Sequence, residues 1–144
     1  MDRKCRLLLG VISSLMETGR QLRLAVRQAH AASQSSSATC IQFVLGNRSL
    51  PRGRRKQRAQ AAASEPDPAW LGADGRDCAE KSYAWFFYAA RWAPPGVLWV
   101  GKADDDSFVR TDALLADLAP LERTRWVVSE AAAATVQSAP ARGV

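Results

Sequence analysis

The beginning of the chain alternates between continuous apolar runs and helical periodicity. Cys5 to Ile12 is a nearly unbroken apolar run, which is typical of a strand buried on both faces. Glu17 to Ala32 carries its apolar residues at helical spacing. Cys40 to Leu45 is a second apolar run, and Gly46-Asn47 stops it. This order of strand, helix and strand predicts a βαβ unit and therefore a parallel sheet.

The middle of the chain interrupts this alternation before it resumes. Arg48 to Asp74 is rich in Arg, Ala and Pro and has little periodicity, so we expect a surface insertion or a poorly ordered linker. Asp77 to Trp92 predicts a helix whose many aromatic side chains pack against the sheet. Val97 to Val100 predicts a third strand, and Thr111 to Leu118 predicts a short helix. Arg125 to Val128 is an expected fourth strand at an edge.

These elements together predict an α/β fold, a mostly parallel sheet with helices on both faces. Residues 5–128 form the expected domain, in which residues 48–74 are the basic insertion. The last helix is expected to be capped by Thr111 or Asp112. Residues 129–144 are Ala-rich and lack a core pattern, which indicates a low-complexity tail.

The positive charge of the chain is concentrated in one segment. The formal net charge is +6, and the run from Arg52 to Arg58 holds five of the 20 basic residues. The rest of the chain is near charge balance, so the overall charge does not indicate a nucleic-acid or membrane partner. No aromatic residue interrupts the run, which favours a solvated insertion. We therefore expect no nucleic acid among the partners.

Cysteine, histidine and apolar length exclude several classes of site. Cys5, Cys40 and Cys78 lie far apart, so a structural zinc site is disfavoured, while one disulfide and one free thiol are allowed. His30 is the single histidine, which argues against His-based triads. No apolar run reaches the roughly 18 to 20 residues needed to span a bilayer. Met1 to Met16 resembles the start of a signal peptide, but its apolar part is short, and a strand is the favoured interpretation.

Three aspartates follow the predicted third strand directly. In open α/β sheets, ligands bind beyond the carboxyl ends of strands. If strand geometry persists, side chains alternate, so Asp104 and Asp106 face one side and Asp105 faces the other. Hard cations such as Mn²⁺ or Mg²⁺ bind carboxylate and diphosphate oxygens together. A solvated turn that caps the next helix is the alternative explanation.

The segment around these aspartates resembles a known family. Trp99 to Leu115 reads WVGKADDDSFVRTDALL, which is similar to the DxD segment of glycosyltransferase family 31, the β-1,3-galactosyltransferase group. Weaker similarities precede it in the family's order: Val11 to Ser14, Arg23 to His30, Phe43 to Gly46 and Asp77 to Ser82. The resemblance extends over about residues 8–128, with a gap at the basic insertion.

The resemblance implies a partial GT-A fold, a Rossmann-like layer that binds a UDP-sugar and Mn²⁺ or Mg²⁺. The implied reaction is inverting transfer of a galactose-type hexose to a hydroxyl on a glycan or a protein, in the Golgi lumen or at its membrane. By the same resemblance, the metal ligands are Asp106 and Asp104, and Asp104 also contacts the nucleoside. The remaining residues implied in nucleotide-sugar binding are Asp105, Arg27, Arg23, Lys102 and Lys81.

The chain also departs from this family. The family continues into an acceptor-binding half that supplies a carboxylate base, and nothing after Asp117 matches it. The family's N-terminal membrane anchor has no counterpart either. We therefore expect only the donor-binding half here, truncated after the DxD segment, and assign no catalytic residue. Two alternatives stay open: a non-catalytic member of the same family, and a basic interaction module that acts through Arg52 to Arg58.

Overall fold

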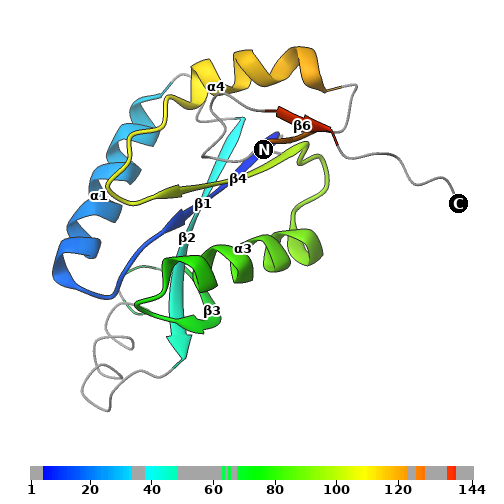
Figure 1. Cartoon of the computed structure of the whole chain (residues 1–144). Coiled ribbons are helices and arrows are strands. Elements are labelled where there is room, and N and C mark those ends of the chain that lie inside the picture. Colours follow the sequence, from blue (N-terminus) through cyan, green and yellow to red (C-terminus); the bar gives the residue numbers. More distant parts are fainter. Residues whose placement is uncertain are drawn as a thin grey trace, which may run out of the picture.

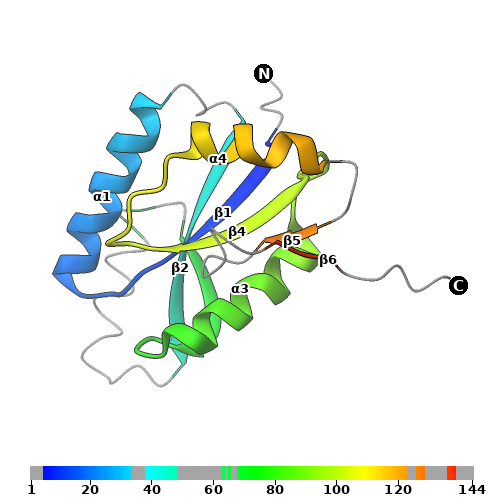
Figure 2. The ribbon, with the colours of Figure 1, turned by 45° about the horizontal axis from the view of Figure 1, so that its top comes forward.

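Four parallel strands form the central sheet, in the order β3-β2-β1-β4. The computed structural model describes residues 5–33, 38–48, 63, 65, 68–122, 126–128 and 136–138. The strands of the sheet are β1 (Leu7–Ile12), β2 (Thr39–Arg48), β3 (Ala69–Asp74) and β4 (Trp99–Asp104). The helices α1 (Glu17–Ala32) and α4 (Thr111–Leu118) cover one face, and α3 (Cys78–Trp92) covers the other (Figures 1 and 2). The predicted α/β class with a parallel sheet and helices on both faces is confirmed.

The central strand β1 explains why its sequence is apolar throughout. Every residue of β1 is buried, because the strand pairs with β2 on one side and β4 on the other while helices cover both faces. Leu9 and Val11 belong to the core beneath α1, whereas Leu8 and Ile12 belong to the core beneath α3. In the pairing with β4, Ile12 lies level with Asp104, so the two strands end together.

The helix α3 packs on the sheet through one indole. Trp85 is fully buried, and its Nε1 donates a hydrogen bond of 2.9 Å to the backbone oxygen of Gly101. A β-carbon at Gly10 would overlap this indole, so the absence of a side chain there lets the helix approach β1. The prediction that the aromatic residues of this helix pack against the sheet is only partly correct. Tyr88 is partly buried against the same core, whereas the helix turns the other aromatic side chains outward. Those more than two-fifths exposed are Tyr83, Phe86, Phe87 and Trp92.

Part of the predicted insertion is a strand of the sheet. Ala69–Asp74 is β3, which pairs in parallel with β2. β2 also continues to Arg48, past the predicted stop at Gly46-Asn47. β2 and β3 approach each other closely at Gly46, where a β-carbon would overlap the backbone of β3. The absence of a side chain at Gly46 allows this approach. The prediction of a surface insertion or a poorly ordered linker is therefore wrong for Ala69–Asp74. The basic run from Arg52 to Arg58 lies outside the described residues.

Two further predictions near the end of the chain need correction. Arg110 occupies the N-cap position of α4 and its side chain makes no capping hydrogen bond, so neither Thr111 nor Asp112 is the N-cap residue. Thr111 is the first helical residue, and its hydroxyl instead lies 3.5 Å from that of Ser33. The strand β5 (Trp126–Val128) pairs antiparallel with β6 (Val136–Ser138), not with the main sheet. The apolar run of β5 is too short to specify its partner strand from the sequence. Its partner β6 lies in the segment that was predicted to be a low-complexity tail.

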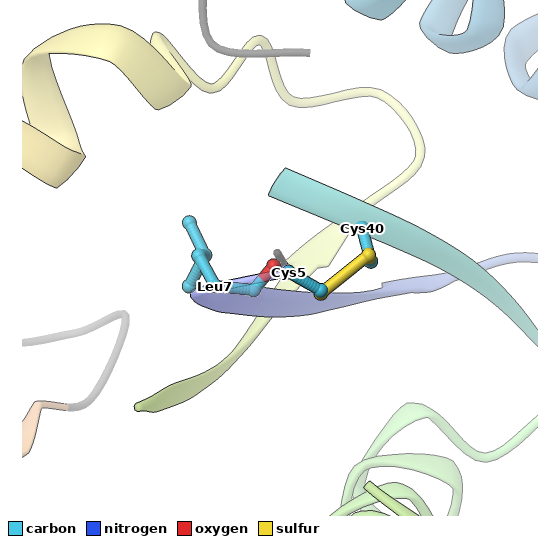
Figure 3. The surroundings of a disulfide bond; sticks show 3 residues. All are labelled: Cys5, Leu7 and Cys40. Atoms are coloured by element: carbon cyan, nitrogen blue, oxygen red, sulfur yellow. Dashed lines mark hydrogen bonds between the residues drawn. A yellow bond between two sulfur atoms is a disulfide. The ribbon is translucent and has the colours of Figure 1, made fainter. Parts of the chain in front are cut away.

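A disulfide joins the starts of the first two strands (Figure 3). It links Cys5 and Cys40, whose Cα atoms are 5.7 Å apart, within the usual range for this bond. Cys78 is exposed and unpaired. Of the arrangements that the sequence allowed, the structure thus has one disulfide and one free thiol. No helix in the described part of the chain is long and apolar enough to cross a membrane.

Candidate functional site

The carboxyl ends of β1 and β4 meet at the point where the strand order of the sheet reverses. From β1 the chain proceeds outward to β2 and β3, and it then returns across the sheet to β4 on the other side. Such a reversal is the usual place for a ligand in an open α/β sheet. Ser13 follows β1 there, and Asp105 and Asp106 follow β4. The topology thus brings segments from distant parts of the sequence to one edge.

The three aspartates lie at the end of a strand and in the turn that follows. β4 ends at Asp104, the Asp105 amide donates to the backbone oxygen of Ile12 at 3.1 Å, and the Ser107 amide donates to that of Asp104 at 3.1 Å. Strand geometry therefore does not persist, so the condition for alternating side chains fails after Asp104. The turn positions Asp105 and Asp106 instead.

The first set of side chains at this edge, which we call the rim, is accessible to solvent. It consists of Lys102, Asp104 and Asp106. The Asp104 side chain is 43% exposed, and the Lys102 Nζ lies 3.5 Å from its Oδ1. Asp106 is exposed, and its carboxylate accepts a 3.5 Å hydrogen bond from the hydroxyl of Ser107. The rim carboxylates are therefore open to an incoming cation or ligand.

The second set, which we call the floor, is buried beneath the turn. It consists of Ser13, Arg23, Glu65 and Lys81, each less than 9% exposed. The Ser13 hydroxyl donates to Asp105 Oδ2 at 2.5 Å and accepts from Arg23 Nη1 at 2.9 Å. Lys81 Nζ donates to the backbone oxygens of Ser13 and Gly75 at 2.8 and 3.2 Å. Ser13 therefore links Asp105 of the turn to the positive charge of Arg23.

A buried ion pair completes the floor. Arg23 donates two parallel hydrogen bonds to Glu65, from Nε to Oε2 at 2.8 Å and from Nη2 to Oε1 at 2.7 Å. Arg27 Nη2 adds a bond of 2.9 Å to Oε2. These hydrogen bonds, that from Arg23 above all, hold the pKa of Glu65 below its ordinary value of 4.5, against the opposing effect of burial. Glu65 thus stays ionised and neutralises the guanidinium next to it.

The basic residues implied in nucleotide binding therefore divide into two groups. Arg23 and Lys81 are 1% and 3% exposed, and their side chains bond to protein atoms within the floor. Arg27 is 29% exposed, and its guanidinium also lies 4.4 Å from the centre of the Phe43 ring. Lys102 stands on the rim. Of the four, Arg27 and Lys102 are thus the ones whose side chains are partly exposed.

Two residues of this network were not identified from the sequence. Ser13 had a recognisable signal, because a polar residue directly follows a continuous buried strand at the edge where the strand order reverses. Glu65 had none, because it lies in an Ala- and Pro-rich stretch without periodicity. Its role depends on its contacts with Arg23 and Arg27, which are distant in the sequence.

The donor set of the rim fits a cation that a substrate also binds. Within the described residues, no group of three or more His, Cys, Asp or Glu side chains could hold a metal ion. Asp104 and Asp106 supply two carboxylates, and Asp105 is bonded to Ser13. Magnesium-like ions are commonly held by one or two carboxylates together with water and substrate phosphates. Asp104 and Asp106 are therefore the two residues of the rim that could contribute oxygen ligands to such an ion.

A small hollow elsewhere is too limited to hold a nucleotide. It has a volume of about 70 Å³ and lies between α1 and the segment that leads from the acidic turn to α4. Its lining is mainly apolar and includes Val26, His30 and Phe108. Ligand pockets for molecules of nucleotide size occupy about 300 Å³ or more. The polar edge at β1 and β4 is therefore the better candidate.

Comparisons with known proteins do not assign the chain to a family. A scan against protein-family models gives no match, and a search of curated proteins gives no significant match. The case for a function therefore depends on the sequence motif and the geometry of the site.

Proposed function

We propose that this chain binds a UDP-sugar together with Mn²⁺ or Mg²⁺ and is the donor-binding part of a GT-A hexosyltransferase of the β-1,3-galactosyltransferase kind. The observation that carries the proposal is the position of the aspartates. They lie at the end of β4 and in the turn after it, at the edge shared with β1, where the strand order reverses. The DxD resemblance gives that position its chemistry, because the same residues form the motif.

The rim has the donors that this reaction needs on the leaving-group side. A divalent cation stabilises the negative charge that develops on a departing diphosphate. Asp104 and Asp106 would hold that cation, and Lys102 would place a further positive charge beside the diphosphate. Arg27 is exposed enough to contact a phosphate oxygen through its planar guanidinium. The residue that deprotonates the acceptor hydroxyl is not assigned.

The acceptor and the location follow from the same proposal. The acceptor would be a hydroxyl of a glycan or of a glycoprotein, and the Golgi would be the compartment. The Cys5–Cys40 disulfide supports a location along the secretory route, because disulfides persist in oxidising compartments.

Calorimetry of UDP binding, with and without Mn²⁺, tests the proposal. We expect binding that needs Mn²⁺ and that is lost in Asp104→Ala/Asp106→Ala. Asp112→Asn/Asp117→Asn removes two acidic charges from α4 and is the matched control, which should bind as the unmodified chain does. If the folded chain binds no UDP in the presence of Mn²⁺, the proposal is wrong.

A further inference from the structure

The polar network beneath the acidic turn suggests a division of roles among the three aspartates. Asp105 is the aspartate whose carboxylate accepts a short hydrogen bond from the floor, at 2.5 Å from the Ser13 hydroxyl. The carboxylates of Asp104 and Asp106 are accessible to solvent, and they accept hydrogen bonds of 3.5 Å from Lys102 and Ser107 respectively. The same turn thus contains one anchored carboxylate between two accessible ones.

The direction of the hydrogen bonds at Ser13 is fixed by the number of protons available. A serine hydroxyl has one proton, and Arg23 has protons to donate but cannot accept one. Arg23 Nη1 therefore donates to the Ser13 oxygen at 2.9 Å, and the hydroxyl proton is directed to Asp105. Donation by a guanidinium polarises the hydroxyl and strengthens its own bond to the carboxylate. The bond between Arg23 and Ser13 is buried and that between Ser13 and Asp105 is partly buried, so water has limited access to both.

The network reaches the turn from three separate segments. Arg23 belongs to α1, Ser13 follows β1, and Glu65 lies in the connection between β2 and β3. Because Glu65 holds Arg23 with two parallel bonds, the guanidinium is fixed in orientation before it contacts Ser13. A fixed guanidinium fixes the hydroxyl, and the hydroxyl fixes Asp105.

We propose that Ser13 and Asp105 are positioning residues: Ser13, held by Arg23, anchors Asp105 so that the turn presents Asp104 and Asp106 to a divalent cation. This inference rests on the proposed function and extends it to residues that do not touch the ligand. Asp105 serves as a hydrogen-bond acceptor and not as a metal ligand. Its negative charge is therefore dispensable, whereas its oxygen is required.

The test compares replacements of the same carboxylate, read by Mn²⁺ titration in the presence of UDP. Asp105→Asn keeps an oxygen that accepts from Ser13, so its Mn²⁺ affinity should stay within about threefold of that of the unmodified chain. Asp105→Ala and Ser13→Ala lose the anchor, and their affinity should fall by about tenfold or more, the size expected for one charge-assisted hydrogen bond. Asp104→Asn should lose affinity to a greater extent than either. Ser82→Ala removes a serine that bonds within α3, and it should change nothing.

Two outcomes would overturn the inference. One is a loss in Asp105→Asn equal to that in Asp104→Asn, which would make Asp105 a ligand. The other is unchanged Mn²⁺ affinity in both Ser13→Ala and Asp105→Ala. If Ser13→Ala does not fold, the Asp105 pair decides the question alone.

A separate measurement distinguishes this inference from the proposed function. If the unmodified chain binds no Mn²⁺ and UDP, the proposed function fails, and hydrogen exchange still reports on the anchor. The Asp105 amide bonds to the backbone oxygen of Ile12, and its exchange should accelerate in Asp105→Ala and remain slow in Asp105→Asn. Equal exchange rates in the two variants would show that Ser13 does not hold the turn.

Discussion

The floor and the rim of the acidic edge use similar residue types in opposite ways. In the floor, Arg23 and Glu65 are buried and bonded to each other with two parallel hydrogen bonds. At the rim, Lys102 and Asp104 lie 3.5 Å apart, and the carboxylate is nearly half exposed. A buried charge that loses its partner is strongly destabilising, whereas an exposed pair contributes little to stability. We infer that the floor maintains the structure and that the rim is available for chemistry.

The largest effect on stability should come from breaking the buried ion pair. Arg23→Met leaves Glu65 buried without its bidentate partner, and it should lower the free energy of unfolding by about 3 to 5 kcal/mol. Urea unfolding at neutral pH measures this. Arg20→Met is the matched control, because Arg20 pairs with Glu17 on the exposed side of the same helix. A urea midpoint equal to that of the control would remove the distinction between floor and surface.

Lys81 of the floor should contribute to stability, whereas Lys102 of the rim should contribute to UDP binding. Lys81→Met leaves the backbone oxygens of Ser13 and Gly75 without their donor, which should cost about 1 to 3 kcal/mol of stability. Lys102→Met should leave the urea midpoint in place and weaken UDP binding instead. Parallel unfolding and calorimetry on both variants check this. An unchanged urea midpoint in Lys81→Met would show that Lys81 does not support the fold as the other floor residues do.

The pH dependence of stability gives a smaller, graded test of the floor. The folded pKa of Glu65 is depressed, so the folded state binds fewer protons than the unfolded state at acidic pH. Its contribution is present in full above the ordinary pKa of 4.5 and is lost as pH falls through the lowered folded value. Glu65→Gln should therefore show a shallower decline in stability below pH 4.5 than the unmodified chain. Equal slopes in urea unfolding from pH 7 to pH 3 would contradict it.

The smallest effect on stability is expected at the rim. Asp104→Asn/Asp106→Asn should change the free energy of unfolding by less than about 0.5 kcal/mol in metal-free buffer. Mn²⁺ with UDP should raise the melting temperature of the unmodified chain by mass action and not that of this variant. A large loss of stability in metal-free buffer would mean that these carboxylates support the turn.

The elements that the sequence predicted well are those with a strong local pattern. The helix Glu17–Ala32 matches the prediction at both ends, and β1 lies within the predicted apolar run. β3 was missed because its buried positions include the small residues Ala69 and Ala73, which give a weak apolar signal. The outward aromatic residues of α3 were misassigned because composition alone does not say which face of a helix meets the sheet.

The site could be predicted in part for a similar reason. The position of Asp104 at the end of a strand follows from the local sequence, and the structure agrees. The local sequence does not predict that Arg23 is buried and Arg27 is partly exposed, because the two arginines lie one turn apart on the same helix. Their roles depend on Glu65, which is 42 positions from Arg23 in the chain and meets it only in the folded state.

Anomalous diffraction at the manganese edge, from crystals of the chain soaked with MnCl₂ and UDP, locates the bound cation. The account predicts an anomalous peak at the carboxyl end of β4, within about 2.5 Å of carboxylate oxygens of Asp104 and Asp106 and of the diphosphate. It also predicts that Asp105 stays bonded to Ser13 in the complex. Ordered UDP with manganese at another edge of the sheet, or a manganese ion bound by Asp105, would contradict the account.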